Sequence, residues 1–191
     1  MCRSSEAEVE HKVPHYVPHQ GRMAPDGVTP LQLRMNMDWT IKDTHGDLPV
    51  YVLVEPPPDS RAKPRDLHWM LAWRVQEEDN FWRVIQVVRE RPVGSDFMNN
   101  YLTNSGPATH ALLTSTTRQG RLIYVGTLSR DQRRELEGIA EEHPVREPDG
   151  TWNCQNFLVE VLELAIARGI VDKETARKAI ADASGGTLVL E

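Results

Sequence analysis

The spacing of apolar residues changes at Ser129, and this change limits the fold more than any other feature of the chain. Before Ser129, apolar residues alternate with polar ones or form short runs rich in valine, isoleucine and aromatic residues, as in β-strands. After Ser129 they recur every three or four residues, as on one face of a helix. A chain with its strands first and its helices last is expected to fold as an α+β protein.

Five strands are expected before Ser129. They come from residues 49–55, 66–76, 81–90, 109–117 and 121–128. The polar residues 77–80 predict a hairpin between the second and third strands, and residues 118–120 predict another between the fourth and fifth. Because short connections join antiparallel rather than parallel neighbours, we expect an antiparallel sheet of about five strands.

Three helices are expected to pack against this sheet. Each has a residue that favours a helix start: Ser129 for the first, Thr151 or Asn153 for the second, and Asp172 for the third. A proline or glycine marks the end of each helix, at Pro144, at Gly169, and at Gly185 and Gly186. The second helix, over residues 151–168, has the clearest apolar face.

The chain is long enough for one domain with a substantial core, which we place at residues 31–191. Residues 1–30 are polar and rich in proline, so we expect a flexible N-terminal arm. The arm contains His11, His15 and His19 at four-residue intervals, a spacing that would suit a metal on a helix. Prolines within this repeat oppose a helix, so we expect no metal and no cofactor, and the role of the arm stays open.

The formal net charge of −6 argues against general nucleic-acid binding, although Arg130, Arg133 and Arg134 form a local basic cluster in the sequence. No apolar run reaches the roughly 18 residues that span a bilayer. The first residues lack the apolar core of a signal peptide. With Cys2 and Cys154 as the only cysteines, no disulfide framework is expected. We therefore expect a cytoplasmic protein in which Cys154 stays a free thiol.

Cys154 lies where a loop gives way to the second helix, and it has two interpretations. It shares one helix face with Phe157, Leu158, Val161, Leu162 and Ala165, so it can be a small apolar residue of the core. The first turn of a helix also lowers the pKa of a thiol, and its N–H groups can bind a developing oxyanion. In that position Cys154 can act as a nucleophile if a base is near.

His68 is the best candidate for that base among the seven histidines. It falls within an apolar strand, with Met70 and Ala72 on its own side, so we expect it to be largely buried. A buried imidazole needs a hydrogen-bonding partner. It is therefore either a core histidine satisfied by a neighbour or one half of a thiolate–imidazolium pair with Cys154.

Five further residues are candidates for substrate contacts. They are Trp152, Asn153 and Gln155 around the thiol, Trp69 on the expected second strand and Arg83 on the third. Trp152 can form a wall of a substrate pocket, and the two amides offer hydrogen-bond donors. Trp69 also follows the alternation of a core strand, which is its simpler interpretation.

The strand "LHWMLAW", followed far downstream by "WNCQNFLVEVL", resembles the circularly permuted branch of the papain-like superfamily, and lecithin:retinol acyltransferase-like proteins in particular. The chain is also similar to small fungal proteins with a WNCQ motif. The likeness covers residues 67–169. It implies a permuted papain-like fold and a Cys–His thiol enzyme, with Cys154 as the nucleophile and His68 as the general base.

The same resemblance implies a third polar residue, often another histidine, on the strand after the base. The segment "FWRVIQVV" offers Arg83 or Gln86 at that place. Arg83 cannot accept a hydrogen bond from an imidazole N–H, so Gln86 is the expected third catalytic residue.

Two functions stay open. The first is an enzyme that forms an acyl-enzyme intermediate on Cys154 and acts as an acyl or aminoacyl transferase or as an amide or ester hydrolase. The second is a non-catalytic domain of the same fold that binds a small molecule or a protein, for which the proline-rich residues 56–64 would suit a gating or contact loop. The identity of the substrate, hydrolysis against transfer, and the oligomeric state are open as well.

Overall fold

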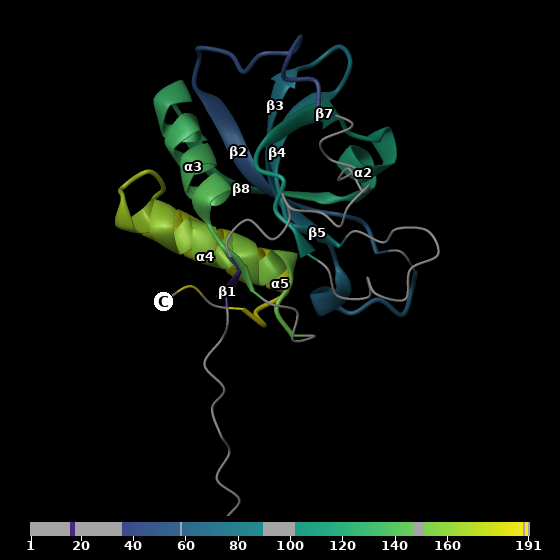
Figure 1. Ribbon diagram of the computed structural model, residues 1–191. Helices are drawn as coiled ribbons and strands as arrows, with labels where there is room; N and C mark the ends of the chain where they lie inside the picture. The colour runs from purple at the N-terminus through teal and green to yellow at the C-terminus, as the bar shows by residue number, and fades with distance from the viewer. Residues whose placement is uncertain are drawn as a thin grey trace, which may run out of the picture.

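The computed structural model describes residues 16–17, 36–57, 59–89, 102–146, 151–188 and 190. These residues form an α+β fold on a five-stranded antiparallel sheet with the strand order β7-β4-β3-β2-β8 (Figure 1). The strands are β2 (Leu48–Val54), β3 (Trp69–Gln76), β4 (Phe81–Ile85), β7 (Ala108–Ala111) and β8 (Arg121–Leu128). The expected fold class and the antiparallel sheet are confirmed.

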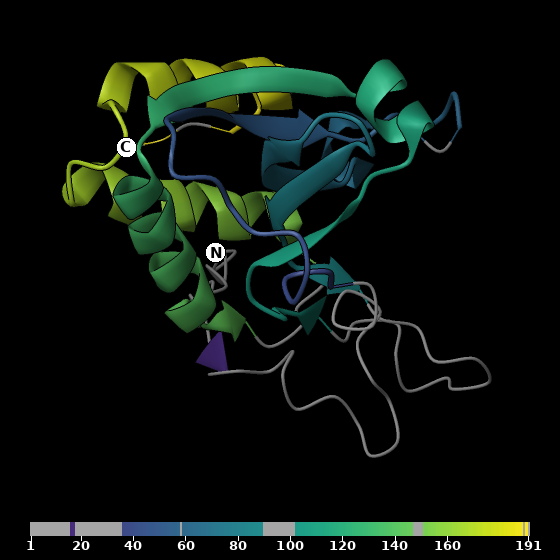
Figure 2. The same ribbon diagram turned by 90° about the horizontal axis from the view of Figure 1, so that it is seen from above.

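Three long helices come last in the chain, as expected. They are α3 (Arg130–Glu142), α4 (Cys154–Ala167) and α5 (Lys173–Ser184), and their N-caps are Ser129, Asn153 and Asp172. Each cap side chain accepts a hydrogen bond from a first-turn N–H, which fixes where the helix begins. Helix α4 packs against β3 and α3, and α5 packs against β8 and β2 (Figures 1 and 2). Within the described ranges, no helix has the length and hydropathy needed to cross a bilayer.

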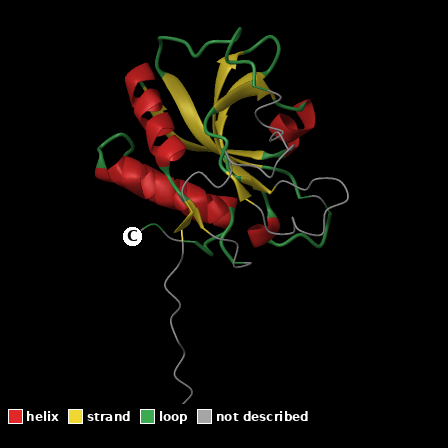
Figure 3. Ribbon diagram, viewed as in Figure 1, coloured by secondary structure: helices red, strands yellow, loops and turns green. Residues whose placement is uncertain are grey.

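The central strands are buried on both faces of the sheet. Trp69, Leu71 and Trp73 of β3 belong to the large core that the helices share, whereas Met70 and Ala72 belong to a smaller core on the opposite face. Figure 3 shows this sheet in yellow with the long helices beside it in red. Burial on both faces explains why β3 reads in the sequence as a continuous apolar run rather than an alternation.

The expected strand over residues 109–117 is only partly present, and the hairpin expected after it is wrong. β7 ends at Ala111, and a short helix, α2 (Thr114–Gln119), follows it. β7 pairs with β4 and β8 pairs with β2, so the two strands lie at opposite edges of the sheet. The β-branched threonines of residues 114–117 favour a strand by local propensity, but this segment forms a helix. The sheet edge that β7 joins depends on its pairing with β4, which is distant in the sequence.

Four short strands and one turn complete the described chain. A 3-10 turn, η1 (Pro64–Asp66), precedes β3, and β5 (Val88–Arg89) pairs with β6 (Leu102–Thr103), so the expected third strand is divided after Ile85. β1 (Tyr16–Val17) pairs with β9 (Val145–Arg146), so part of the expected N-terminal arm is hydrogen-bonded to the rest of the chain. Cys2, His11, His15 and His19 lie outside the described residues.

Arg133 does not form a surface patch with its neighbours Arg130 and Arg134. Its side chain is fully buried. Its five N–H donors bond to both carboxylate oxygens of Asp43 and to the backbone carbonyls of residues 44, 46 and 128. The arginine therefore connects α3 to the end of β8 and to the loop before β2, which is a structural role.

Candidate active site

Cys154 is the first residue of α4, and its position is fixed by the cap before it. The side-chain oxygen of Asn153 accepts the N–H of Gln155 at 2.9 Å, and the side-chain oxygen of Asn156 accepts the N–H of Asn153 at 3.1 Å. The residues that share the apolar face of Cys154 on α4 are all buried, as expected. Cys154 itself keeps 9% of its surface exposed, so its thiol lies at the boundary of the core.

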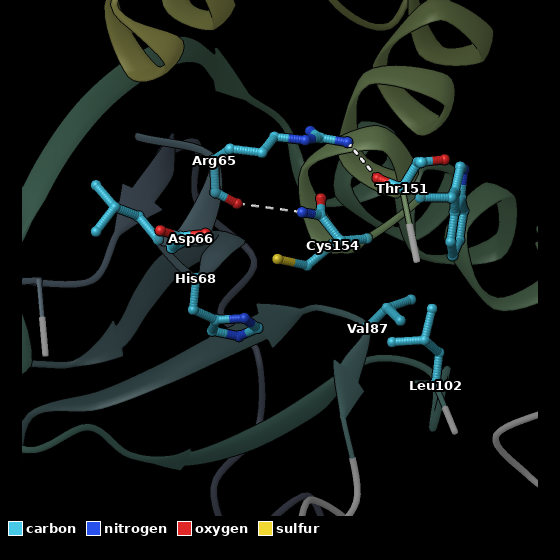
Figure 4. A pocket seen from close by; sticks show the side chains of 10 residues that line it. Arg65, Asp66, His68, Val87, Leu102, Thr151 and Cys154 are labelled. Carbon is cyan, nitrogen blue, oxygen red and sulfur yellow. Dashed lines mark hydrogen bonds between the residues drawn. The ribbon is translucent and has the colours of Figure 1, made fainter. Parts of the chain in front are cut away.

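His68 lies at the end of the sheet, next to this helix start. It precedes the first residue of β3 instead of lying within the strand, and its carbonyl oxygen accepts the N–H of Glu55 at 2.9 Å. Its imidazole and the Cys154 thiol interact closely enough for each group to shift the pKa of the other. In Figure 4 the Cys154 sulfur points toward the His68 ring across the open space of the site. The structure therefore brings together the two residues that the sequence had paired as base and nucleophile.

Gln86 holds the far side of the imidazole. It follows β4 directly, is 6% exposed, and its Oε1 lies 2.6 Å from His68 Nε2. Because an amide oxygen only accepts hydrogen bonds, this contact requires a proton on Nε2. The other ring nitrogen, Nδ1, is then left to face the thiol. Gln86 thus occupies the position expected of an orienting residue for His68.

The surroundings of the pair favour its charged form. Burial alone would lower the pKa of His68, but the hydrogen bond and charge of Cys154, the hydrogen bond to Gln86 and the charge of Glu55 raise it to about 9. Burial would likewise raise the pKa of the Cys154 thiol. The hydrogen bond and charge of His68, the N–H of Trp69 and the charge of Arg65 together lower that pKa below its usual value. Both shifts favour the charged thiolate–imidazolium pair over the neutral pair.

Arg65 belongs to the site although sequence reasoning did not select it. It lies on η1, and its guanidinium donates to the side-chain oxygen of Gln155 at 3.1 Å, to the carbonyl of Thr151 at 2.8 Å and to the side-chain oxygen of Asn156. Its charge is one of the causes that lower the pKa of Cys154. The only sequence signal was its place three residues before His68, in a polar segment that reads as a solvated loop.

Gln155 is buried next to the site and holds the turn at residues 64–67 against the start of α4. It is 1% exposed, and its amide nitrogen donates to the carbonyls of Pro64 and Leu67 at 2.8 and 2.9 Å. Both N–H donors of its amide are therefore used by the turn that carries Arg65 and leads to His68. This side chain connects the nucleophile's helix to the base's turn, whereas we had expected it to contact substrate.

A cavity of about 750 Å³ opens beside the sulfur, and the pair lies in its wall. The charged residues Arg65 and Asp66 line part of it, and Val87, Leu102 and Trp152 form an apolar part (Figure 4). The Trp152 indole N–H donates to a carboxylate oxygen of Glu160 at 2.9 Å, which fixes the ring in this wall. Asn153 also lines the cavity, so two of the expected substrate contacts face it.

The side chains of Trp69 and Arg83 do not line the cavity. The Trp69 side chain is fully buried in the large core, and its backbone N–H instead donates to Cys154. Arg83 forms ion pairs with Asp38 and with Glu137, the latter at 2.7 Å. Because Arg83 lies three positions before Gln86 along an extended strand, it is displaced from the end of the sheet where the site lies.

None of the other described histidines approaches the thiol. His45 contacts Arg130, and His143 contacts Glu160 at 2.9 Å. Across the part of the chain that the structure describes, no group of three or more histidine, cysteine, aspartate or glutamate side chains is placed to hold a metal ion.

No model of a known protein family matches the chain, and neither a curated protein nor a solved structure does.

Proposed function

We propose that the protein is a Cys–His thiol enzyme that forms an acyl-enzyme intermediate on Cys154. It would act as an acyl or aminoacyl transferase or as an amide or ester hydrolase. The observation that carries this proposal is that Cys154 and His68 line the same cavity and shift the pKa of each other, with the Gln86 side-chain oxygen 2.6 Å from His68 Nε2. Nucleophile, base and orienting group in this order match the general arrangement of thiol acyl-transfer enzymes.

The order of the segments supports a permuted papain-like fold for this enzyme. In the chain, the base comes first, at the start of a sheet strand, and the nucleophile comes later, at the start of a helix. This is the arrangement implied by the resemblance to the permuted papain-like branch. Cys154 and His68 also lie next to each other in space, which the short sequence motifs alone do not show.

The chemistry follows from the charges of the pair. The Cys154 thiolate attacks the substrate carbonyl carbon, a C–S bond forms, and the carbonyl electron pair moves to the oxygen. The positive end of α4 stabilises that oxyanion. The oxyanion collapses, the bond to the leaving group breaks, and the proton on His68 Nδ1 passes to the leaving group.

In the second half of the reaction, His68 Nδ1 removes a proton from water, an amine or a hydroxyl group. The deprotonated acceptor attacks the thioester, and the thiolate leaves with the electrons of the C–S bond. Water as the acceptor gives hydrolysis, and an amine or hydroxyl compound gives transfer. The Gln86 carbonyl keeps the ring oriented through both halves.

The test combines thiol labelling with detection of an acyl adduct. Native protein is labelled with iodoacetamide at about pH 6, where an ordinary thiol is almost unreactive. We expect fast labelling of Cys154, and a mass increase of one acyl group when the protein is mixed with a p-nitrophenyl ester. Both signals are expected to be lost in Cys154→Ala and strongly reduced in His68→Ala, while Cys2→Ser serves as the matched control and keeps both.

Labelling no faster than that of the denatured protein, together with no adduct, would overturn this proposal. That result would favour the non-catalytic binding domain, because the cavity would then be a binding site without a reactive thiol.

A further inference from the structure

The guanidinium of Arg65 carries a positive charge that no carboxylate pairs with among the described residues. Its three hydrogen-bond acceptors, on Thr151, Gln155 and Asn156, are all neutral oxygens. The carboxylate of the adjacent Asp66 instead accepts the backbone N–H of Lys63 at 2.9 Å and is exposed to solvent. Arg65 is only partly buried on the cavity wall, so water and these neutral oxygens solvate its charge and no carboxylate of the described residues neutralises it.

The Cys154 thiolate does not remove this excess charge. Within the reactive pair, the negative sulfur is balanced by the positive imidazolium of His68, so the pair as a whole offers Arg65 no net counter-charge. The Asp66 carboxylate lines the same cavity but is exposed to solvent. Of the five N–H donors of the Arg65 guanidinium, its three hydrogen bonds use both donors on Nη2 and one on Nη1. The Nε–H and one Nη1–H remain for a ligand.

The rest of the wall complements this charge. Val87, Leu102 and Trp152 line the apolar part of the cavity, while Arg65 and Asp66 line the polar part (Figure 4). A ligand that fills this space would carry a polar, anionic group near Arg65 and an apolar group near Trp152. The sulfur of Cys154 lies in the same wall and can reach a carbonyl held between them.

We propose that Arg65 selects acyl donors that carry a carboxylate close to the carbonyl attacked by Cys154. This inference rests on the proposed thiol chemistry and adds the class of substrate to it. Charge attraction and the remaining N–H donors of Arg65 hold the carboxylate, and the neutral partners of the guanidinium hold the arginine itself in place.

A pair of alkylating reagents tests the charge preference without knowledge of the natural substrate. Iodoacetate and iodoacetamide have nearly the same shape, but only iodoacetate carries a carboxylate. In both reactions the sulfur attacks the methylene carbon, the C–I bond breaks, and iodide leaves. The ratio of the two rate constants on Cys154 therefore measures how the site treats a negative charge beside the reacting atom.

We expect iodoacetate to react faster than iodoacetamide with the wild-type protein, with the preference weakened by salt. In Arg65→Gln the ratio should fall by roughly tenfold or more, the size expected for losing a charged hydrogen bond. Arg65→Lys should keep most of the preference. Arg61→Gln is the matched control, because Arg61 lies in the same segment with its side chain 88% exposed and paired with Asp59, and its ratio should not change.

The outcomes separate this inference from the proposed function. Fast labelling by both reagents, with the same ratio in wild type and Arg65→Gln, would overturn the role of Arg65 and leave the thiol chemistry standing. Equal slowing of both reagents in Arg65→Gln would mean that Arg65 only stabilises the thiolate, which also overturns carboxylate selection. Slow labelling of the wild type by both reagents would instead contradict the proposed function itself.

Competition identifies the kind of anion. Acetate in excess is expected to slow labelling by iodoacetate in the wild type but not in Arg65→Gln. Slowing by inorganic phosphate and not by acetate would contradict the preference for a carboxylate.

Discussion

At the scale of single residues, the lowered pKa of Cys154 results from hydrogen-bonding and charge contributions of a few neighbours that together outweigh burial. A thiolate with little exposed surface is unfavourable by itself. The imidazolium of His68, the N–H of Trp69 and the charge of Arg65 all act in the opposite direction. All three lie within residues 65–69, far from Cys154 in the chain, so the pKa of the thiol depends on the fold rather than on the local helix start alone.

The pH dependence of alkylation should reveal this lowered thiol pKa. As pH falls, an ordinary cysteine loses its thiolate below about pH 8.5, whereas Cys154 should stay reactive to a lower pH because its pKa is depressed. In His68→Ala, the midpoint of the pH–rate profile for iodoacetamide should return to about 8.5 or higher. A wild-type midpoint near that of a free thiol would show that the charged pair does not form.

The upper side of the profile distinguishes alkylation from acyl transfer. The pKa of His68 is raised to about 9, so above this pH the imidazole no longer holds the proton that the leaving group needs. Transfer from an amide donor should therefore decline above about pH 9, while alkylation, which needs only the thiolate, should not. A decline in both would point to loss of the folded site at high pH.

Gln86 should control the charge of His68 without touching the substrate. Replacing it in Gln86→Leu removes the acceptor of a buried Nε2–H, which lowers the pKa of His68 and weakens the thiolate. The rate of iodoacetamide labelling at about pH 6 should fall by roughly tenfold or more, since a hydrogen bond to a charged group is lost. Gln86→Glu keeps an acceptor and should keep the rate, so equal rates in Gln86→Leu and wild type would exclude an orienting role.

At the scale of elements, Gln155 connects the start of α4 to the turn before β3. Its three hydrogen bonds with residues 64, 65 and 67 are made by a side chain with almost no exposure. Gln155→Met keeps the volume but leaves the partly buried carbonyl oxygens of Pro64 and Leu67 without this donor. We expect the free energy of unfolding to fall by about 2–4 kcal/mol, measured by urea denaturation.

Gln119→Met is the matched control for this substitution. Gln119 is exposed at the end of α2, so the same chemical change there should alter stability by no more than about 0.5 kcal/mol. In Gln155→Met, the labelling of Cys154 should also slow, because the turn that positions His68 is released from the helix. Equal stability in the two variants would show that Gln155 does not connect the elements.

The elements that could be predicted from the sequence are those whose start and end are determined by neighbouring residues in the chain. The caps Ser129, Asn153 and Asp172 set the starts of the three long helices, and the apolar runs set β2, β3 and β8. The position of β7 was not predictable in this way, since its pairing with β4 depends on residues far away in the chain. The helix α2 was missed because threonines favour strands wherever tertiary contacts do not decide otherwise.

The candidate site shows the same division. Cys154 and His68 could be chosen because few residues have the required chemistry, and Gln86 followed from the need for an acceptor. Arg65 was missed because its role depends on a contact between η1 and the start of α4, which no local pattern shows. Arg83 was placed on the correct strand but too far from the strand end to reach the cavity.

At the scale of the whole molecule, the site lies at one end of the sheet, whereas Arg133 holds the end of β8 and the loop before β2 together. Arg133 connects α3, the last residue of β8 and the loop at Asp43, and Asp43 also accepts the indole N–H of Trp73 at 3.3 Å. Trp73 is four residues along β3 from Trp69, whose N–H contacts the thiol. Arg133 therefore stabilises the fold at a place away from the reactive thiol.

Because Arg133 lies away from the thiol, replacing it should lower stability without changing the reactivity of Cys154. Arg133→Met should lower the free energy of unfolding by about 3–5 kcal/mol, because it removes one partner of a buried ion pair and leaves the Asp43 carboxylate without its main donor. Arg134→Met, one residue further along α3 at an exposed position, should change it by no more than about 0.5 kcal/mol. Both are measured by urea denaturation. In the fraction of Arg133→Met that stays folded, Cys154 should still be labelled at the wild-type rate. A loss of labelling before unfolding would show that Arg133 and the site are coupled through β3.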